Sequence, residues 1–190
     1  FTADLLRDTQ QHEPAVTAYT RLISLGVDQH HALRERTKLR LMARQWPEAT
    51  TDLSELLQQS PNDVVLLKQR ALALQKQFRW TLAIADWTQI GLIDNTNVEA
   101  MEARADAFLT LGETNAAVSD LNSLLRYKPD NHRIAERLAH LYAQLDQPDE
   151  AVRVLSPVVE SGHASTSLVF MRARALEQTG ESDAALRDLN

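Results

Sequence analysis

The chain has 190 residues, a formal net charge of −6 at pH 7 and no cysteine. The lack of cysteine excludes disulfides, thiolate zinc sites and cysteine nucleophiles, and the negative charge argues against a general nucleic-acid binder, which is normally basic. Hydrophobic residues make up 44% of the chain, as in folded domains. No apolar run approaches the roughly 18 residues of a membrane span, and no signal-peptide pattern follows Phe1. We expect a soluble segment whose compartment the sequence does not identify.

Small residues recur along the chain with a period of 34 residues. One column is alanine throughout: Ala15, Ala49, Ala83, Ala117, Ala151 and Ala185. A constant period indicates one structural unit copied in tandem, each copy burying its apolar face against its neighbours. The period predicts a single array with a partial unit at 1–29, full units at 30–63, 64–97, 98–131 and 132–165, and a partial unit at 166–190.

Each unit is predicted to contain two antiparallel helices. Large apolar residues follow the alanine column by four and by seven positions, as Leu121 and Leu124 follow Ala117, and this spacing lies on one face of a helix. Another column of small residues precedes the alanines by twelve positions, about one helix plus a turn. Gly112 and Gly180 fall where the two helices must turn. The pattern predicts an all-α chain of about twelve helices.

The unit spanning 98–131 carries a family resemblance. Its ordered positions are Ala105, Phe108, Gly112, Ala117, Leu121, Leu124 and Pro129. Their order and spacing resemble the tetratricopeptide repeat (TPR) pattern, and the resemblance covers essentially the whole chain. Departures occur at Arg40, which replaces an apolar residue, at Arg44, Phe78 and Asp146, which replace glycine, and at Val27, Asn95 and His163, which replace proline. The resemblance implies a right-handed superhelical solenoid and a non-enzymatic protein-binding function.

Arginines and aspartates also recur in phase, sixteen residues apart within a unit. Four units have both charges, and the unit with Leu138 instead of arginine has Val154 instead of aspartate. This joint loss favours an ion pair that ties the two helices of a unit, over an arginine ladder for phosphates or acidic chains. The predicted pairs are Arg36–Asp52, Arg70–Asp86, Arg104–Asp120 and Arg172–Asp188.

The resemblance also implies a concave groove lined by the first helices of successive units, with a peptide or a helix of another protein as ligand. The groove residues that it implies are Arg34, Lys38, Leu41, Lys68, Leu72, Lys76, Glu99, Glu102, Asp106, Leu109, Glu136, His140, Phe170 and Arg174. The basic residues precede the acidic ones, so the groove is expected to orient a charged segment. Ordinary solvated helix faces with accidental clustering are the alternative.

Other functional sites have weaker support. A clamp for the acidic tail of chaperones is not expected, because both of its asparagines are missing and acidic residues lie in the middle of its frame. His132, Glu136 and His140 lie four residues apart but have no further convergent ligand, so no metal and no cofactor is predicted. Trp46 and Trp80 are expected to pack the turn between helices rather than to serve as exposed anchors.

We find no phosphate loop, nucleophile elbow or zinc-protease signature. The sequence therefore predicts a protein-interaction scaffold and not an enzyme. Two alternatives stay open. The chain could be an accessory domain of a larger enzyme, or a self-associating module, because both ends are cut inside repeats and a longer native protein is expected.

Overall fold

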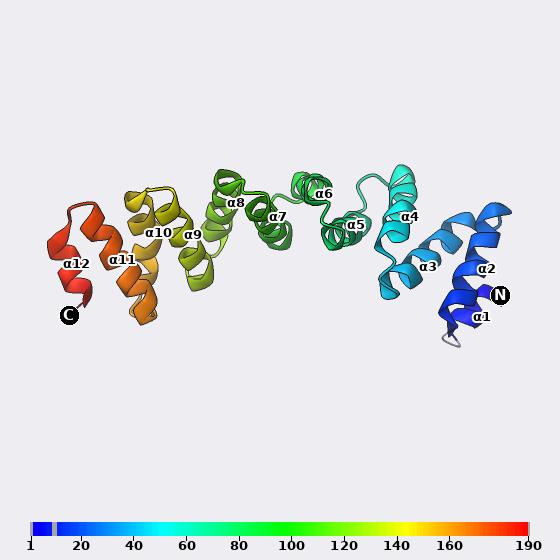
Figure 1. The fold of residues 1–190 in the computed structure, drawn as a ribbon, viewed down its shortest axis with the longest axis horizontal. Helices are drawn as coiled ribbons and strands as arrows, with labels where there is room; N and C mark the ends of the chain where they lie inside the picture. Colours follow the sequence, from blue (N-terminus) through cyan, green and yellow to red (C-terminus); the bar gives the residue numbers. More distant parts are fainter. Residues whose placement is uncertain (1, 9–10, 190) are drawn as a thin grey trace. The chain divides into compact units, whose positions relative to one another are not determined.

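The computed structural model describes residues 2–8 and 11–189, and these residues form twelve α-helices without strands (Figure 1). Contacts divide the chain into two compact units, Phe1–Ala100 and Met101–Asn190. The first unit contains α1 (Thr2–Asp8), α2 (His12–Ser24), α3 (Gln29–Met42), α4 (Trp46–Gln59), α5 (Val64–Lys76), α6 (Trp80–Ile93) and the first residues of α7 (Val98–Thr110). The second contains the rest of α7, α8 (Thr114–Tyr127), α9 (His132–Gln144), α10 (Pro148–Glu160), α11 (Thr166–Gln178) and α12 (Ser182–Leu189).

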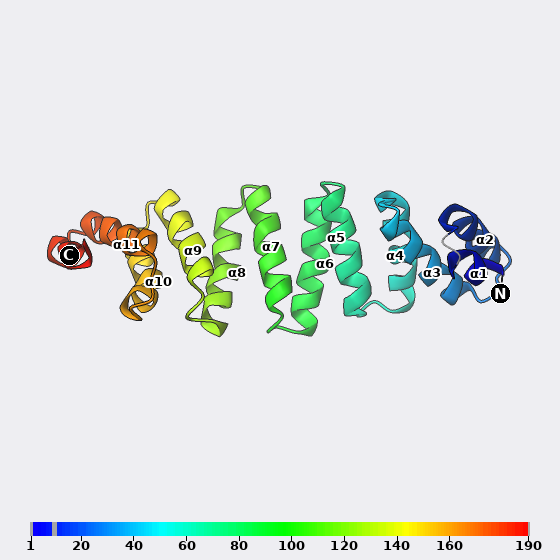
Figure 2. The same ribbon diagram turned by 90° about the horizontal axis from the view of Figure 1, so that it is seen from below.

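Helices that follow one another in the chain pack against each other. In the first unit this holds from α1 through α6, and in the second from α8 through α12. The pairs are antiparallel hairpins, as α5 and α6 show (Figure 2). Their bounds follow the period of the sequence, since α4, α6 and α8 begin at Trp46, Trp80 and Thr114. No described helix combines the length and the apolar character that a bilayer span requires.

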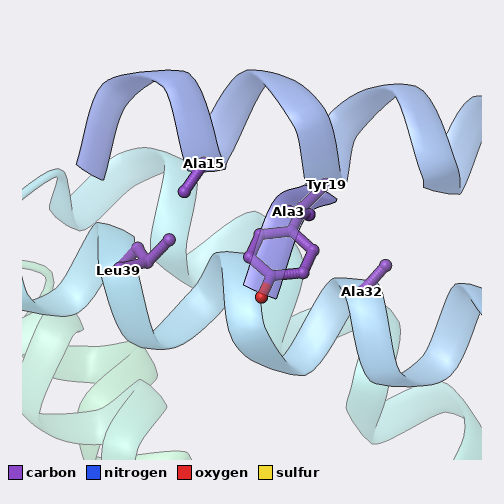
Figure 3. Packing of buried hydrophobic residues seen from close by; sticks show 5 residues of the cluster. All are labelled: Ala3, Ala15, Tyr19, Ala32 and Leu39. Atoms are coloured by element: carbon purple, nitrogen blue, oxygen red, sulfur yellow. The ribbon is translucent and has the colours of Figure 1, made fainter. Parts of the chain in front are cut away.

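The alanine column lies where the helices approach most closely. Ala15, Ala49, Ala83 and Ala117 have no solvent-exposed surface. Figure 3 shows the arrangement in the first unit, where Ala15 and Tyr19 of α2 face Ala32 and Leu39 of α3. A methyl group at the contact allows close helix packing, and the larger apolar residues one and two turns later fill the space on either side.

From the α3–α4 pair to the α11–α12 pair, the turn inside each helix pair uses one residue in the left-handed backbone region. Gly112 and Gly180 adopt φ values of 77° and 86° there, a conformation open to glycine without steric cost. Arg44, Phe78 and Asp146, which stand where the repeat pattern has glycine, adopt the same conformation at φ of 59°, 58° and 55°. The turn geometry is therefore kept, and the non-glycine residues bear its backbone strain.

Candidate functional site

Helix α5 presents a mixed apolar and basic face. Val65, Lys68, Leu72 and Lys76 follow one another at spacings of three and four residues, which places them on one side of the helix. Val65 is 63% exposed and Leu72 is 42% exposed. Asp63 fixes the start of the helix, because its side chain accepts hydrogen bonds from the backbone N–H groups of Val65 and Leu66 at 3.0 and 3.2 Å.

A cavity of about 460 Å³ opens beside this face. Val65, Lys68 and Leu72 contribute from α5, Trp87 and Ile90 from α6, and Asn97 and Glu99 from the start of α7. Trp87 is 2% exposed, and its indole Nε1 has no hydrogen-bond partner. We define this cavity and the exposed side chains of α5 as the α5 groove. It combines largely apolar walls with two oppositely charged residues, Lys68 and Glu99, and Lys76 lies further along the same helix face.

Most charged residues of the expected groove form ion pairs, chiefly with residues on or beside a neighbouring first helix. In the first unit, Lys68 Nζ lies 2.7 Å from Glu99 Oε2, and Arg34 Nη2 lies 3.2 Å from Asp63 Oδ2. In the second unit, Arg133 Nη2 lies 2.8 Å from Glu102 Oε1, and Arg137 contacts Asp106. These exposed pairs contribute at most about 1 kcal/mol each to stability, but they neutralise much of the charge on the helix faces.

The remaining groove residues have different surroundings. Leu41, Leu109 and Glu136 are half-buried, whereas Lys38, Lys76, His140, Phe170 and Arg174 are exposed. Within the described residues, Lys76 in the first unit and Glu136 in the second have no ion-pair partner. An unpaired lysine therefore remains at the end of α5, and an unpaired glutamate on α9.

The four arginine–aspartate pairs join the two helices of a repeat in the same bidentate geometry. The distance from arginine Nη2 to aspartate Oδ1 is 2.6 Å in the first three pairs and 2.5 Å in Arg172–Asp188. The aspartate side chains are at most 9% exposed. The hydrogen bonds that Arg104 donates to Asp120 raise the pKa of Arg104, and those that Arg172 donates to Asp188 raise the pKa of Arg172. At the positions without charges, Leu138 and Val154 are buried.

Two of these arginines, Arg36 and Arg70, make a third contact that the repeat pattern had not indicated. Arg36 Nη1 donates to Thr20 Oγ1 at 3.1 Å, and Arg70 Nη1 donates to Ser54 Oγ at 3.2 Å. Thr20 and Ser54 belong to the second helix of the preceding repeat, so each arginine connects three helices. The available signal was the 34-residue spacing of these two hydroxyl residues. Arg40, noted as a departure from the pattern, adds a second cation 2.7 Å from Asp52.

A polar network at the start of the chain was also missed, because its members are far apart in sequence. Tyr19 Oη donates to Asp4 Oδ1 at 2.8 Å, and this bond together with one from His31 lowers the pKa of Asp4 to about 2. Glu35 is 7% exposed, and Arg7 Nη1 lies 2.7 Å from its Oε2. Burial raises the pKa of Glu35, but hydrogen bonds from Lys38 and Arg7 outweigh it, and the net pKa is lowered.

No cluster of three potential metal ligands occurs among the described residues, and His132, Glu136 and His140 do not converge. Trp46 and Trp80 are half-buried at the starts of α4 and α6. The Trp80 ring meets the ring of Phe78 edge to face, with centroids 6.4 Å apart. Phe78 itself is 78% exposed.

Comparison with known proteins agrees with this geometry. Residues 108–169 match a family model described as tetratricopeptide repeat. The C-terminal part of a TPR repeat-containing protein from Cytophaga hutchinsonii superposes with a TM-score of 0.65 and 15% identity, covering 98% of this chain and 75% of that chain. The chain therefore has the fold of TPR proteins, and residues 108–169 carry the TPR sequence pattern.

Other proteins are similar to this chain over part of their length or at low sequence identity. A crystal structure of MamA protein has a TM-score of 0.63 and 16% identity, covering 84% of this chain and 87% of that chain. Human DnaJ homolog subfamily C member 3 is 27% identical over 146 residues, which cover 69% of this chain. The match spans only 29% of that relative. The TPR fold makes this chain a protein-interaction scaffold in general terms, and scaffolds of this kind are typically non-catalytic.

Proposed function

We propose that the chain binds a peptide or a helix of a partner protein along its first helices, with the α5 groove as the centre of the site. The observation that carries this proposal is the exposure of Val65 and Leu72 beside a cavity of about 460 Å³. Exposed apolar side chains next to a hollow are a common feature of protein-binding surfaces.

The groove also suggests the chemistry of its ligand. Lys76 is unpaired within the described residues, and Lys68 is bound only to an exposed glutamate, Glu99. An acidic group on the ligand can therefore pair with Lys76 or displace Glu99 from Lys68. The buried N–H of Trp87 lacks a partner, and Trp87 is one of the walls. The ligand expected from these features is a segment with one or two bulky apolar side chains next to a carboxylate.

Selection from a phage-displayed library of random 12-residue peptides tests this proposal. Peptides that bind the unmodified protein are counter-selected on a variant carrying Val65→Asp and Leu72→Asp. Both side chains are exposed, so the variant is expected to keep its helical circular dichroism. The expected result is a set of peptides that the variant does not bind, with apolar residues next to Asp or Glu. If every selected peptide binds the variant as well as the unmodified protein, the α5 groove is not the site.

Self-association is a second candidate, favoured by exposed apolar surface at both ends of the described chain. A cavity of about 790 Å³ on α2 is lined by Ala18, Leu22 and Leu25 among others. Phe170, Leu186 and Leu189 line another of about 430 Å³ on α11 and α12. Such surfaces can stack on those of a second copy. Light scattering over a concentration series tests this, because a constant monomer mass would rule it out.

A further inference from the structure

The turn between α5 and α6 exposes an aromatic side chain whose position the fold does not explain. Phe78 is 78% exposed, and its backbone φ is 58°. Side chains disfavour this backbone region, and a bulky one is a genuine outlier there. The equivalent positions hold Arg44, Gly112, Asp146 and Gly180, so Phe78 is the one large apolar residue among them. The backbone strain at Phe78 is not offset by burial of its ring. This combination is expected for a residue that binds a partner rather than for one that packs in the core.

The Phe78 ring has a defined setting. The ring of Trp80 contacts it edge to face at 70°, with centroids 6.4 Å apart, and Trp80 is half-buried at the start of α6. An aromatic side chain held by a neighbouring ring loses little conformational entropy on binding, which favours its use as an anchor.

A small hollow adjoins this turn in the first unit. Its volume is about 280 Å³, and its lining mixes apolar and polar side chains. Leu74, Arg79 and Leu82 line one part of it, Thr50 and Ser54 of α4 line another, and the ion pair of Arg70 and Asp86 lines the rest. Leu82 is 46% exposed. The surface therefore combines an exposed ring, an exposed leucine and a hollow large enough for one apolar side chain. We define Phe78, Arg79, Trp80 and Leu82 with this hollow as the turn site.

Arg79 leaves the turn site with one unbalanced positive charge, because Arg70 and Asp86 at the hollow pair with each other. Within the described part of the chain, Arg79 has no ion-pair partner. Helix α6 has no acidic residue in its first turn, and no side chain caps its N-terminus. The partly positive end of the helix is therefore not compensated by the protein's own carboxylates.

We propose that the turn site is a second protein-binding surface, separate from the α5 groove, which takes an acidic segment of another protein carrying a bulky apolar side chain. The apolar side chain of the partner packs on Phe78 and Leu82 at the hollow, and its carboxylates pair with Arg79 and lie near the start of α6. A nucleic acid is a poorer fit, because few free cations are present at the turn and the whole chain has a net charge of −6.

The same random peptide library tests this surface, with Phe78→Gly as the variant for counter-selection. Glycine adopts a φ of 58° without steric strain, so the variant should melt at the same temperature as the unmodified protein or higher. Asp146→Gly is the matched control, since Asp146 has a φ of 55° at the equivalent position of another repeat. A synthetic peptide from the selection is then titrated against each protein by fluorescence anisotropy, together with a single-stranded 12-nucleotide DNA.

The expected result is a set of peptides rich in Asp and Glu around one bulky apolar residue. Their affinity should fall at least tenfold in Phe78→Gly and in Arg79→Glu, and stay unchanged in Asp146→Gly and in the Val65→Asp and Leu72→Asp variant. The last comparison separates failure of this site from failure of the α5 groove. The proposal is overturned if no peptide depends on Phe78, if dependent peptides lack acidic residues, or if the DNA binds as tightly as they do. Loss of self-association in Phe78→Gly without dependent peptides would assign the surface to a second copy.

Discussion

The pair formed by Arg70 and Asp86 allows the contribution of a repeated buried ion pair to be measured. Asp86 is 4% exposed, and Arg70 is bound to it through two hydrogen bonds of 2.9 and 2.6 Å. Arg70→Leu leaves a buried carboxylate without a cation, a change that costs about 3–5 kcal/mol in general. We expect about 3 kcal/mol, because the adjoining cavity of about 280 Å³ gives Asp86 some access to water.

The other variants of the cycle should cost less. In Asp86→Val, Arg70 keeps its hydrogen bond to Ser54, and its side chain, which is 25% exposed, stays in contact with water. We therefore expect the free energy of unfolding to fall by about 1–2 kcal/mol. The double variant places Leu and Val at the positions where another repeat has Leu138 and Val154. We expect its stability to lie within about 1 kcal/mol of the unmodified protein. Ser54 still donates to the carbonyl of Thr50 at 2.7 Å.

Urea unfolding followed by circular dichroism provides the free energies. Repeat arrays can unfold in stages, so the cycle is valid only if the four proteins share one m-value. The expected coupling is at least about 2 kcal/mol in favour of the pair. Arg21→Leu, at an exposed arginine of α2, is the control and should change stability by less than about 0.5 kcal/mol. A double variant as unstable as the sum of the two single variants would refute the reasoning.

Three further changes test the packing, the turns and the buried network. Ala83→Leu should destabilise by about 1–3 kcal/mol, since Ala83 has no exposed surface, whereas Ala85→Leu on the exposed side of α6 should have little effect in the same urea titration. Gly112→Ala should cost about 1 kcal/mol, because its φ of 77° strains a side chain although no atom lies within 4 Å of the new Cβ; a larger loss in a thermal melt would indicate a clash instead. Glu35→Gln should cost about 1–3 kcal/mol at pH 7. Because the folded-state pKa of Glu35 is lowered, its contribution is complete above its unfolded pKa of about 4.3 and is lost as the pH falls through the folded-state value. The difference in melting temperature between the two proteins should therefore shrink as the pH falls below the unfolded pKa of about 4.3, and a constant difference would contradict this assignment.

The repeat architecture was predictable because its signals lie within one unit of 34 residues. The offsets of four and seven residues after Ala117 define a helix face regardless of what covers it. The joint replacement of arginine and aspartate by Leu138 and Val154 indicated which residues belong together. Both arguments compare copies of the same unit within one chain, so they need no knowledge of how the units stack.

The candidate sites were less predictable, because they depend on distances between helices of different repeats. The helix positions of Lys68 and Glu99 followed from the period, but their pairing at 2.7 Å did not. Trp80 was expected to pack the turn, and it is half-buried. Phe78 was noted only as a replacement for glycine, and the pattern contained no signal that its ring would be 78% exposed.

By itself, the sequence determined the all-α repeat, the helix pairs and the column of alanines at their contacts, because period and hydrophobic spacing are local properties of the chain. Only the tertiary structure decided which charges neutralise one another, which hydroxyls of the preceding repeat Arg36 and Arg70 reach, and which apolar side chains remain exposed. These features depend on the approach of helices about thirty residues apart, as Arg133 and Glu102 illustrate with a separation of 31 residues. Side-chain packing sets that approach, and no spacing within a single repeat encodes it.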